Sequence, residues 1–177
     1  MGEEPSGPAP FEPGVRRARP LDRGELVRLG EAARSHVGHH RGGDVYQERE
    51  GRPDPLRDSL DADLAAADAG SALVLVGGLG PVAVGYAVVR LEETVNGRLA
   101  VVSDLFVEPD ARGVGVGRAL MEAVVEWATD SGCHGVDAEV LPGDRSTKNF
   151  FEAFGLVARK ITVHRSLGER SPDGSRG

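Results

Sequence analysis

The sequence contains little cysteine, few aromatic residues and no long apolar run. Its 177 residues include one cysteine, Cys133, and aromatic residues make up 5% of the chain. A single cysteine excludes an intrachain disulfide and a four-cysteine zinc site, and it favours a reducing compartment. No stretch approaches the roughly 20 consecutive apolar residues of a membrane helix. Residues 1–14 lack the basic start and apolar middle of a signal peptide, so we expect a cytoplasmic protein without membrane contact.

Basic residues are also in short supply. The chain has 21 Lys and Arg against 28 Asp and Glu, a formal net charge of −7. An acidic chain without a basic run argues against nucleic acid as a partner and mildly favours cationic ligands. The 40% hydrophobic and 28% charged residues are typical of a globular protein, and the length favours one domain.

Both ends of the chain differ from the middle in composition. Residues 1–14 and 168–177 are rich in Gly, Pro, Ser and charged residues, which cannot bury a core. The sequence therefore predicts disordered tails over 1–14 and 168–177, and a folded domain over 15–167.

Hydrophobic periodicity predicts alternating strands and helices within that domain. Residues 38–53 lack such a pattern and are predicted as a loop. A strand, a helix and a second strand between 99 and 141 form a βαβ unit, whose strands should be parallel. Because the preceding strands follow one another as hairpins, the sheet should be mixed. The predicted strands are 15–20, 72–76, 82–92, 99–107, 136–141 and 157–164, and the predicted helices are 22–37, 54 or 59 to 70, 118–130 and 146–154.

The most informative segment is the glycine-rich turn between the strand 99–107 and the helix 118–130. Gly113, Gly115 and Gly117 alternate there, which is more glycine than a tight turn needs. The first N–H groups of a helix have no partner inside the helix and lie at the positive end of its dipole. Glycines let a phosphate approach such groups closely, so the segment predicts an anion site.

Two common phosphate motifs do not fit this turn. A dinucleotide fingerprint needs glycine at its first, third and sixth positions, but the sixth position is Arg118 counted from Gly113 and Leu120 counted from Gly115. The P-loop needs Gly-Lys followed by Ser or Thr, and the chain has no Gly-Lys pair. The pattern that fits is Arg/Gln-x-x-Gly-x-Gly/Ala, through Arg112, Gly115 and Gly117.

That pattern resembles the pyrophosphate-binding signature of the GNAT N-acetyltransferase superfamily. A later segment, 144–156 (DRSTKNFFEAFGL), is similar to the family's Asn-x-x-Ala-x-x-Phe-Tyr-x-x-x-Gly-Phe helix. The predicted order of elements over 15–167 also resembles the family's order. The resemblance implies an α/β fold of the GNAT type, with three α-β-α layers and a mixed, centrally splayed sheet.

The resemblance also implies an activity. It implies transfer of an acetyl group from acetyl-CoA to a primary amine by direct attack in a ternary complex. The amine would belong to a small molecule, a peptide or a protein side chain, and a homodimer is common in the family. The alternative is a CoA-binding sensor or structural protein of the same fold that does not catalyse.

The resemblance places the cofactor along the end of the strand 99–107 and the glycine turn. In the family the turn's backbone N–H groups hold the pyrophosphate and the strand end holds the pantetheine arm, beyond the carboxyl ends of parallel strands. The residues so implied are Leu105, Phe106, Val107, Arg112, Gly113, Val114, Gly115, Val116, Gly117, Arg118, Asp144 and Phe151.

Two of these residues depart from the family pattern. Asp144 stands where the family has Asn, and an acid there still accepts a hydrogen bond from an amide. Phe151 stands where many members have a Tyr that protonates the leaving thiolate, and Phe has no proton to donate. Water, Tyr46 or Tyr86 is then left as the acid, although Tyr86 lies in a predicted strand and is better explained by packing.

Asp104 is the first candidate for the catalytic base that takes the proton of the amine, and Glu139 is the second. Asp104 interrupts the apolar run 101–107, so it is either satisfied structurally by hydrogen-bond donors or functional. His36, His39 and His40 are close in sequence, but no acid or cysteine completes a metal-binding pattern. We therefore expect no metal, and we expect the loop 38–53 to line the acceptor site.

Overall fold

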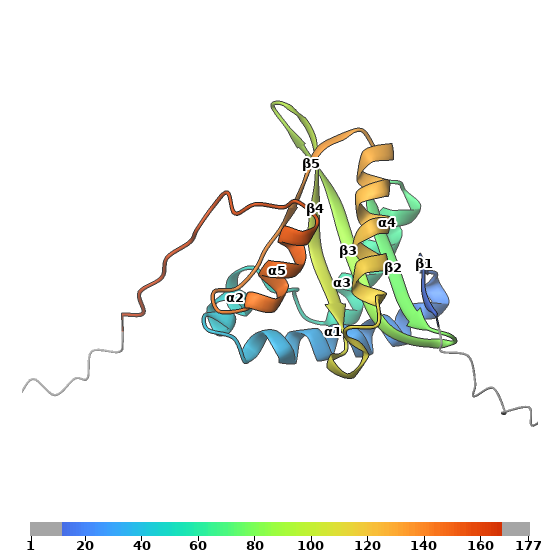
Figure 1. Ribbon diagram of the computed structural model, residues 1–177, viewed down its shortest axis with the longest axis horizontal. Helices are drawn as coiled ribbons and strands as arrows, with labels where there is room; N and C mark the ends of the chain where they lie inside the picture. The colour runs from blue at the N-terminus through green and yellow to red at the C-terminus, as the bar shows by residue number, and fades with distance from the viewer. Residues whose placement is uncertain (1–11, 168–177) are drawn as a thin grey trace, which may run out of the picture.

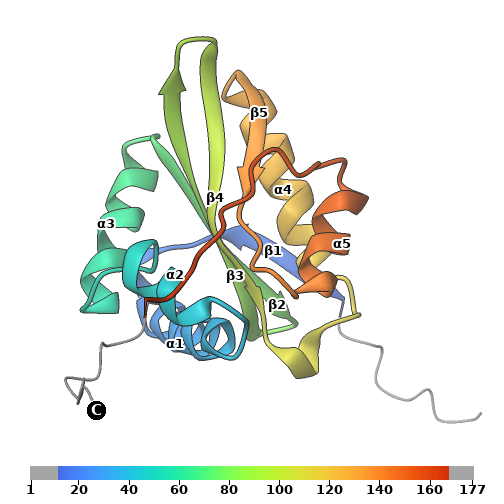
Figure 2. The same cartoon turned by 90° about the vertical axis from the view of Figure 1, so that its left-hand side faces the viewer.

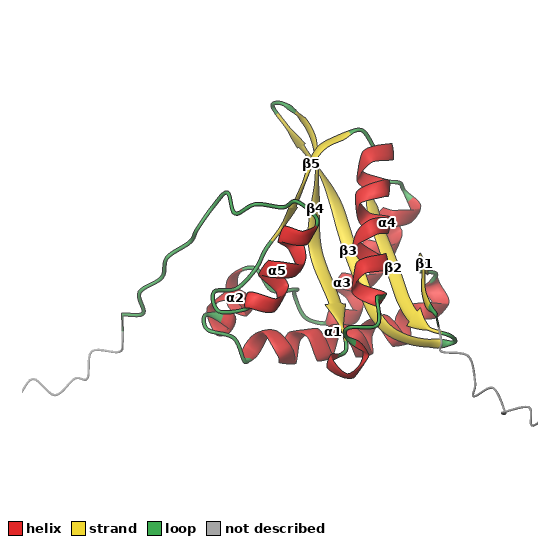
Figure 3. Cartoon of the chain, in the orientation of Figure 1, coloured by secondary structure: helices red, strands yellow, loops and turns green. Residues whose placement is uncertain are grey.

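The structure is a computed structural model that describes residues 12–167, and it shows a five-stranded sheet between two layers of helices (Figures 1 and 3). The strand order is β1-β2-β3-β4-β5. The first three pairings are antiparallel and β4 pairs with β5 in parallel. The strands are β1 (Pro13–Arg17), β2 (Ala72–Leu79), β3 (Val82–Thr94), β4 (Gly97–Val107) and β5 (Cys133–Ala138), and the helices are α1 (Arg23–Gly38), α2 (Gly43–Arg49), α3 (Leu56–Asp68), α4 (Val116–Asp130) and α5 (Arg145–Ala153).

Each face of the sheet buries its own hydrophobic core. Figure 2 shows α1, α2 and α3 on one side of the sheet and α4 and α5 on the other. Successive side chains of β3 point to opposite faces of the sheet and so enter different cores. Tyr86 and Val88 pack with the leucines of α1 and α3, whereas Ala87 and Val89 pack against α4. Three layers with a mixed sheet confirm the predicted fold class. Within residues 12–167, no helix is both long and apolar enough to cross a bilayer.

The sheet splays between its two parallel strands. The β4–β5 ladder ends at the pair Val102 and Ala138, whereas β4 continues to Val107 in its pairing with β3. Figures 1 and 2 show β5 separating from the lower part of β4. The predicted central splay is therefore present, and the last residues of β4 have no strand partner on that side.

A β-bulge at Ser103 marks the start of the splay. Val89 pairs with Val102 and the next residue of β3 toward its start, Val88, pairs with Asp104. Ser103 is therefore an extra residue, and such bulges change the direction in which the following side chains point. Val102 packs in the core of α4, and strict alternation would send Asp104 to the same face. The bulge instead places Asp104 on the side of α1 and α3.

Two predictions in this region were wrong. Residues 38–53 contain the short helix α2, whose two turns are too short to display an apolar period. Residues 157–164 form no strand. They alternate apolar and polar residues, but a strand needs a partner, and this segment leaves the sheet (Figure 1), with Val157, Ile161 and Val163 exposed by 81%, 84% and 90%.

Several predicted boundaries shift. β5 covers 133–138 rather than 136–141, because the chain turns away from β4 once the splay begins. α4 begins at Val116, so the last part of the glycine turn is its first turn. β1 includes residues 13 and 14, which the sequence assigned to a disordered tail, because they pair with β2. Residues 1–11 and 168–177, the rest of the two predicted tails, lie outside the described residues.

Candidate active site

The glycine turn presents a row of unpaired backbone donors. Within residues 12–167, the N–H groups of residues 113–118 donate to no backbone or side-chain acceptor. Gly113 and Gly115 adopt left-handed backbone angles, with φ of +81° and +97°, which bring the chain sharply into α4. Donors at the start of a 15-residue helix form an anion site without further side chains. The expectation that this turn is built for a phosphate therefore fits the geometry.

Gly117 differs from the other two glycines. It is not among the glycines with positive φ, and a Cβ there would lie 3.6 Å from both Phe150 and Val107, an ordinary contact. The fold itself therefore leaves room for alanine, which agrees with the Gly/Ala choice in the motif. The exposed Val114 and the buried Val116 complete the turn, and Val116 anchors it in the α4 core.

Arg112 fastens the turn to the end of β4. Its Nε donates to the Val107 carbonyl oxygen at 3.0 Å, and its guanidinium lies 6.0 Å from the centre of the Phe106 ring. Phe106 and Val107 are buried, with 7% and 8% exposure, and Leu105 packs against the α4 core. Arg112 therefore stabilises the strand end. Beyond Val102, the backbone N–H and C=O groups on this edge of β4 have no pairing with β5, and they face the gap between the two strands.

The start of α5 forms the other side of that gap. Asp144 caps the helix, because its carboxylate accepts hydrogen bonds from Thr147 N at 3.0 Å and Thr147 Oγ1 at 2.7 Å. Burial alone would raise the pKa of Asp144, but these hydrogen bonds outweigh it and the pKa is lowered. Phe151 is buried with 6% exposure in the α4 core beside Phe150. It acts there as a packing residue.

Asp104 lies within a network of charged side chains, of which Asp63 is buried and Arg52 and Asp104 are partly buried. Arg52, just after α2, reaches Asp104 Oδ2 from Nη2 at 2.5 Å and Asp63 Oδ2 from Nη1 at 2.5 Å. The hydroxyl of Tyr86, which is fully buried, donates to Asp104 Oδ1 at 2.9 Å. Arg90 holds the other oxygen of Asp63 at 2.7 Å. Asp104 therefore accepts hydrogen bonds from both Arg52 and Tyr86, as the structural interpretation of this residue expected.

Glu139 and Tyr46 lie next to this network. Glu139 is exposed just beyond β5. Burial raises the pKa of the half-buried Tyr46 phenol to about 12, and the negative charges of Glu139, Asp104 and Glu50 add to this effect. Tyr46 therefore stays protonated at neutral pH and faces both predicted catalytic carboxylates. The helix α2, predicted as a loop, brings it there from residues 38–53.

Arg52 is the residue of this network that the sequence reasoning missed. Nothing around it suggests a motif, but its partner Asp63 carries a signal. Asp63 lies between Leu60 and Leu64 on the buried face of α3 and is 2% exposed. An acid at such a position must have a partner, and a search for the missing cation would have pointed to Arg52 or Arg90.

The geometry agrees with a comparison of the chain with known families. Residues 43–156 match the model of the acetyltransferase (GNAT) family, which is more than half of the chain. The chain belongs to the GNAT family of acetyltransferases. The resemblance that rested on the glycine turn and the α5 segment is therefore confirmed, and the family is one of acyltransferases.

Two curated relatives share part of the sequence. One is the thialysine N-epsilon-acetyltransferase of Bos taurus, 32% identical over 77 residues, or 43% of this chain and 45% of that protein. The other is an aminoglycoside N(6')-acetyltransferase type 1 of Stenotrophomonas maltophilia, 38% identical over 85 residues, or 45% of this chain and 54% of that protein. The matches thus span about half the length of these relatives.

Solved structures match over nearly their whole length. A tetramutant of the BH1408 protein from Bacillus halodurans has a TM-score of 0.70 and 25% identity, covering 86% of this chain and 99% of that chain. AAC(6')-Iy, solved with a bisubstrate analog of CoA and acetylneamine, has a TM-score of 0.64 and 20% identity, covering 88% and 98%. These structures share the fold described above.

Proposed function

We propose that this protein transfers an acetyl group from acetyl-CoA to a primary amine in a ternary complex. The observation that carries the proposal is the row of unpaired N–H groups at residues 113–118, at the head of α4 and beside the free edge of β4. A pyrophosphate needs such a set of donors. The extended pantetheine arm next to the pyrophosphate needs a strand edge that is not paired with another strand, and the splay between β4 and β5 supplies one.

Each side of the gap has a part in holding acetyl-CoA. The turn residues 113–118 would bind the pyrophosphate, and the backbone of 105–107 would align the pantetheine arm. Asp144 at the head of α5 would accept an amide N–H from the other side. When bound, acetyl-CoA supplies the acetyl thioester. A backbone N–H of 105–107 would polarise its carbonyl.

The acceptor would approach from the side of α2 and α3. Tyr46, Glu139 and Asp104 gather there, and negative groups attract a cationic amine. The matched relatives are named for amine substrates, thialysine and aminoglycosides. The chain's own charge of −7 agrees with an amine acceptor.

Glu139 and Asp104 would then have different roles. Asp104 already accepts hydrogen bonds from Arg52 and Tyr86, which suits a positioning residue that fixes the splayed edge. The exposed Glu139 would take a proton from the ammonium, directly or through a water. The neutral nitrogen then attacks the acetyl carbonyl and the C–N bond forms. The C–S bond breaks as the nitrogen, now positively charged, gives up its second proton to water. The departing thiolate takes one proton from water or from Tyr46, because Phe151 has none.

Two measurements test the proposal in sequence. Acetyl-CoA should raise the melting temperature of the full chain, because it binds the folded state alone. The protein should then release free thiol from acetyl-CoA when offered lysine analogues, polyamines, aminoglycosides or a lysine peptide. Glu139→Gln should lower kcat and retain the acetyl-CoA shift, whereas Glu48→Gln, an exposed acid on α2, should change neither.

The alternative function is CoA binding without catalysis, and it has one observation in its favour. Phe151 is buried in the core and offers no hydroxyl. A melting shift with acetyl-CoA and no thiol release with any amine class would favour this alternative. Absence of any shift would contradict both functions.

A further inference from the structure

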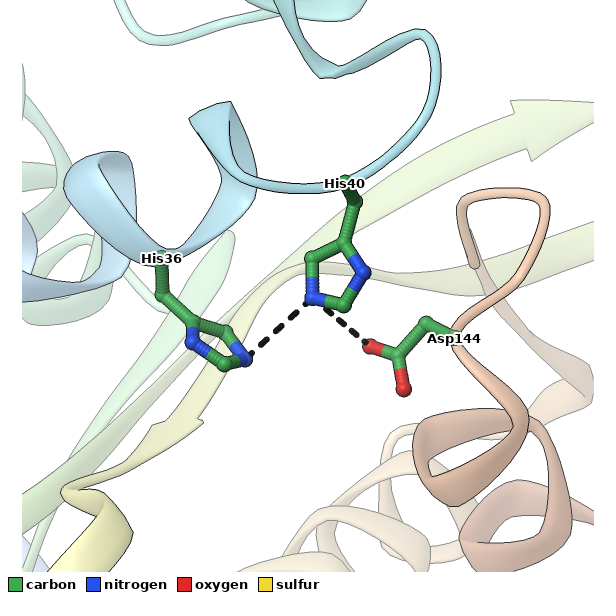
Figure 4. Close-up of side chains that lie close together, drawn as sticks. All are labelled: His36, His40 and Asp144. Atoms are coloured by element: carbon green, nitrogen blue, oxygen red, sulfur yellow. Dashed lines mark hydrogen bonds and ion pairs between the residues drawn. The ribbon is translucent and has the colours of Figure 1, made fainter.

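Three side chains that are far apart in sequence converge at the end of α1. His36 lies in the last turn of α1, His40 follows two residues after the helix, and Asp144 caps α5. Figure 4 shows the two imidazole rings and the carboxylate pointing toward one another from the end of α1, the loop that follows it and the start of α5. His36 Nε2 and His40 Nε2 are 3.4 Å apart, and His40 Nε2 is 3.8 Å from Asp144 Oδ2. The three ligand atoms all lie within 4.8 Å of one another.

This spacing matches the edge of a metal coordination sphere. Zn²⁺ binds imidazole nitrogen at about 2.0–2.1 Å in a tetrahedral arrangement, which places two ligand nitrogens about 3.3 Å apart by simple geometry. The observed separation of 3.4 Å between the two Nε2 atoms therefore needs almost no change. The carboxylate must move closer to both rings, because it lies 3.8 Å from His40 Nε2 and the three ligand atoms lie within 4.8 Å of one another.

We propose that His36 Nε2, His40 Nε2 and Asp144 Oδ2 bind one divalent ion of the zinc class. Two imidazoles and one carboxylate form a donor set that suits zinc and its transition-metal neighbours, while Mg²⁺ and Ca²⁺ prefer oxygen ligands. The sequence alone argued against a metal because no acid accompanied the histidines. The fold supplies that acid from a position more than a hundred residues later in the chain.

The surroundings of the cluster already orient one of the ligands and favour a cation beside the other two. Thr147 and Ser146 hold the carboxylate of Asp144 through three hydrogen bonds, which is the support that ligating carboxylates usually have. Both histidines lie at the carboxyl end of the 16-residue α1, where the helix dipole favours a cation. All three residues are partly buried, so the ion would exchange with solvent.

The Arg112 side chain must move when the ion binds. Arg112 Nη2 lies 3.3 Å from His36 Nε2 and now occupies the lone pair that the metal needs. Arg112 keeps a second anchor, the bond from its Nε to the Val107 carbonyl. The guanidinium can therefore turn its Nη2 away without leaving the end of β4.

The test is a calorimetric titration of Zn²⁺ into the full chain after treatment with a chelator and removal of the chelator, without acetyl-CoA. We expect one ion per chain. His36→Ala and His40→Ala should each weaken binding on the order of 100-fold, since even outer-shell changes cost about 10–100-fold. His39→Ala is the matched control. His39 is exposed and its Nδ1 contacts Ser35 O at 2.6 Å, so this change should leave the affinity unchanged.

A second variant and a second probe keep the test independent of folding. Asp144→Asn retains a good helix cap but removes the charged ligand, so it should weaken Zn²⁺ at least about 10-fold. The lowered pKa of Asp144 implies some loss of metal-free stability in this variant, and its metal-free melting temperature shows that the chain still folds. Co²⁺ in place of Zn²⁺ should give the intense visible bands of a tetrahedral site in the parent chain and lose them in His40→Ala.

Several results would overturn the site. These are the absence of a saturable Zn²⁺ titration, binding that survives both His36→Ala and His40→Ala, or an equal loss in His39→Ala, which would indicate casual binding by surface histidines. Because acetyl-CoA is absent from every arm, failure here leaves the proposed acetyltransferase function untouched. Conversely, a chain that binds no acetyl-CoA can still pass this test.

Discussion

At the scale of single residues, Arg52 links three segments on the face of the sheet that α1 and α3 cover. It joins α3, β4 and the segment after α2 through Asp63 and Asp104. Burial alone would lower the pKa of Arg52, but the two carboxylates raise it well above its usual value. A charge held in this way is costly to remove, because its partners stay buried.

Arg52→Ala should therefore lower the free energy of unfolding by about 3 kcal/mol. Asp104 would lose its cation, while Asp63 would keep Arg90. Urea unfolding of the full chain measures the change. Arg23→Ala removes the more exposed pair with Asp61 and should cost less than about 1 kcal/mol. Equal losses in the two variants would show that the Arg52 network adds no more than a surface pair.

Asp22 makes the free energy of unfolding depend on pH in the acidic range. Hydrogen bonds from Arg16 lower the pKa of Asp22, outweighing the effect of its burial, and Arg19 N adds a further bond. A lowered folded-state pKa contributes stability that is complete above the unfolded pKa of about 3.9 and is lost as the pH falls through the folded value.

Asp22→Asn should thus destabilise the chain at pH 7 and flatten the loss of stability below about pH 4. Urea midpoints at pH 7, 4 and 3 measure both effects. Asp58→Asn, an exposed change in α3, should leave the pH profile of the parent unchanged. A variant profile as steep as that of the parent would assign the acid sensitivity to other carboxylates.

At the scale of elements, the sequence predicted those that carry their own signal. β2, β3, β4 and α4 follow from apolar period and turn residues, and their existence is confirmed. α2 was missed because it is short. Residues 157–164 were wrongly predicted as a strand because the tertiary structure, and not the local sequence, decides whether a neighbouring strand is there to pair with them. The bulge at Ser103 decides to which face of the sheet Asp104 points. The hydrophobic pattern of the sequence does not reveal such a single extra residue. The glycine turn and the helix after it were therefore predictable from the sequence, whereas the arrangement around Asp104 was not.

The glycine turn offers a matched pair of substitutions. Gly115→Ala forces a side chain into φ of +97°, which costs about 1–2 kcal/mol or reorients the donors. It should weaken acetyl-CoA binding by more than about 10-fold, the equivalent of 1.4 kcal/mol. Gly117→Ala meets only ordinary contacts and should keep both affinity and stability. Calorimetry with acetyl-CoA measures the difference, and equal affinities in the two variants would move the pyrophosphate away from this turn.

At the scale of the whole molecule, the splay divides the sheet unequally. β5 pairs only with the first half of β4, from Arg98 to Val102, whereas β2 and β3 pair along most of their lengths. The half that contains β5 and α5 is therefore held by fewer ladder bonds. Regions with fewer such bonds open at a lower free energy than the core strands. The homodimer implied by the family stays a prediction.

Acetyl-CoA should consequently stabilise the two halves unequally. A ligand bound across the gap between β4 and α5 adds about 2.7 kcal/mol at a hundred times its Kd, and opening of β5 and α5 would require its release. Hydrogen exchange with and without acetyl-CoA measures this. Amides of 133–138 and 145–153 should slow strongly, and amides of the α1–α3 side should change less. Uniform slowing would indicate a ligand that stabilises the fold as a whole, and slowing confined to α3 would place it on the acceptor side, outside the splay.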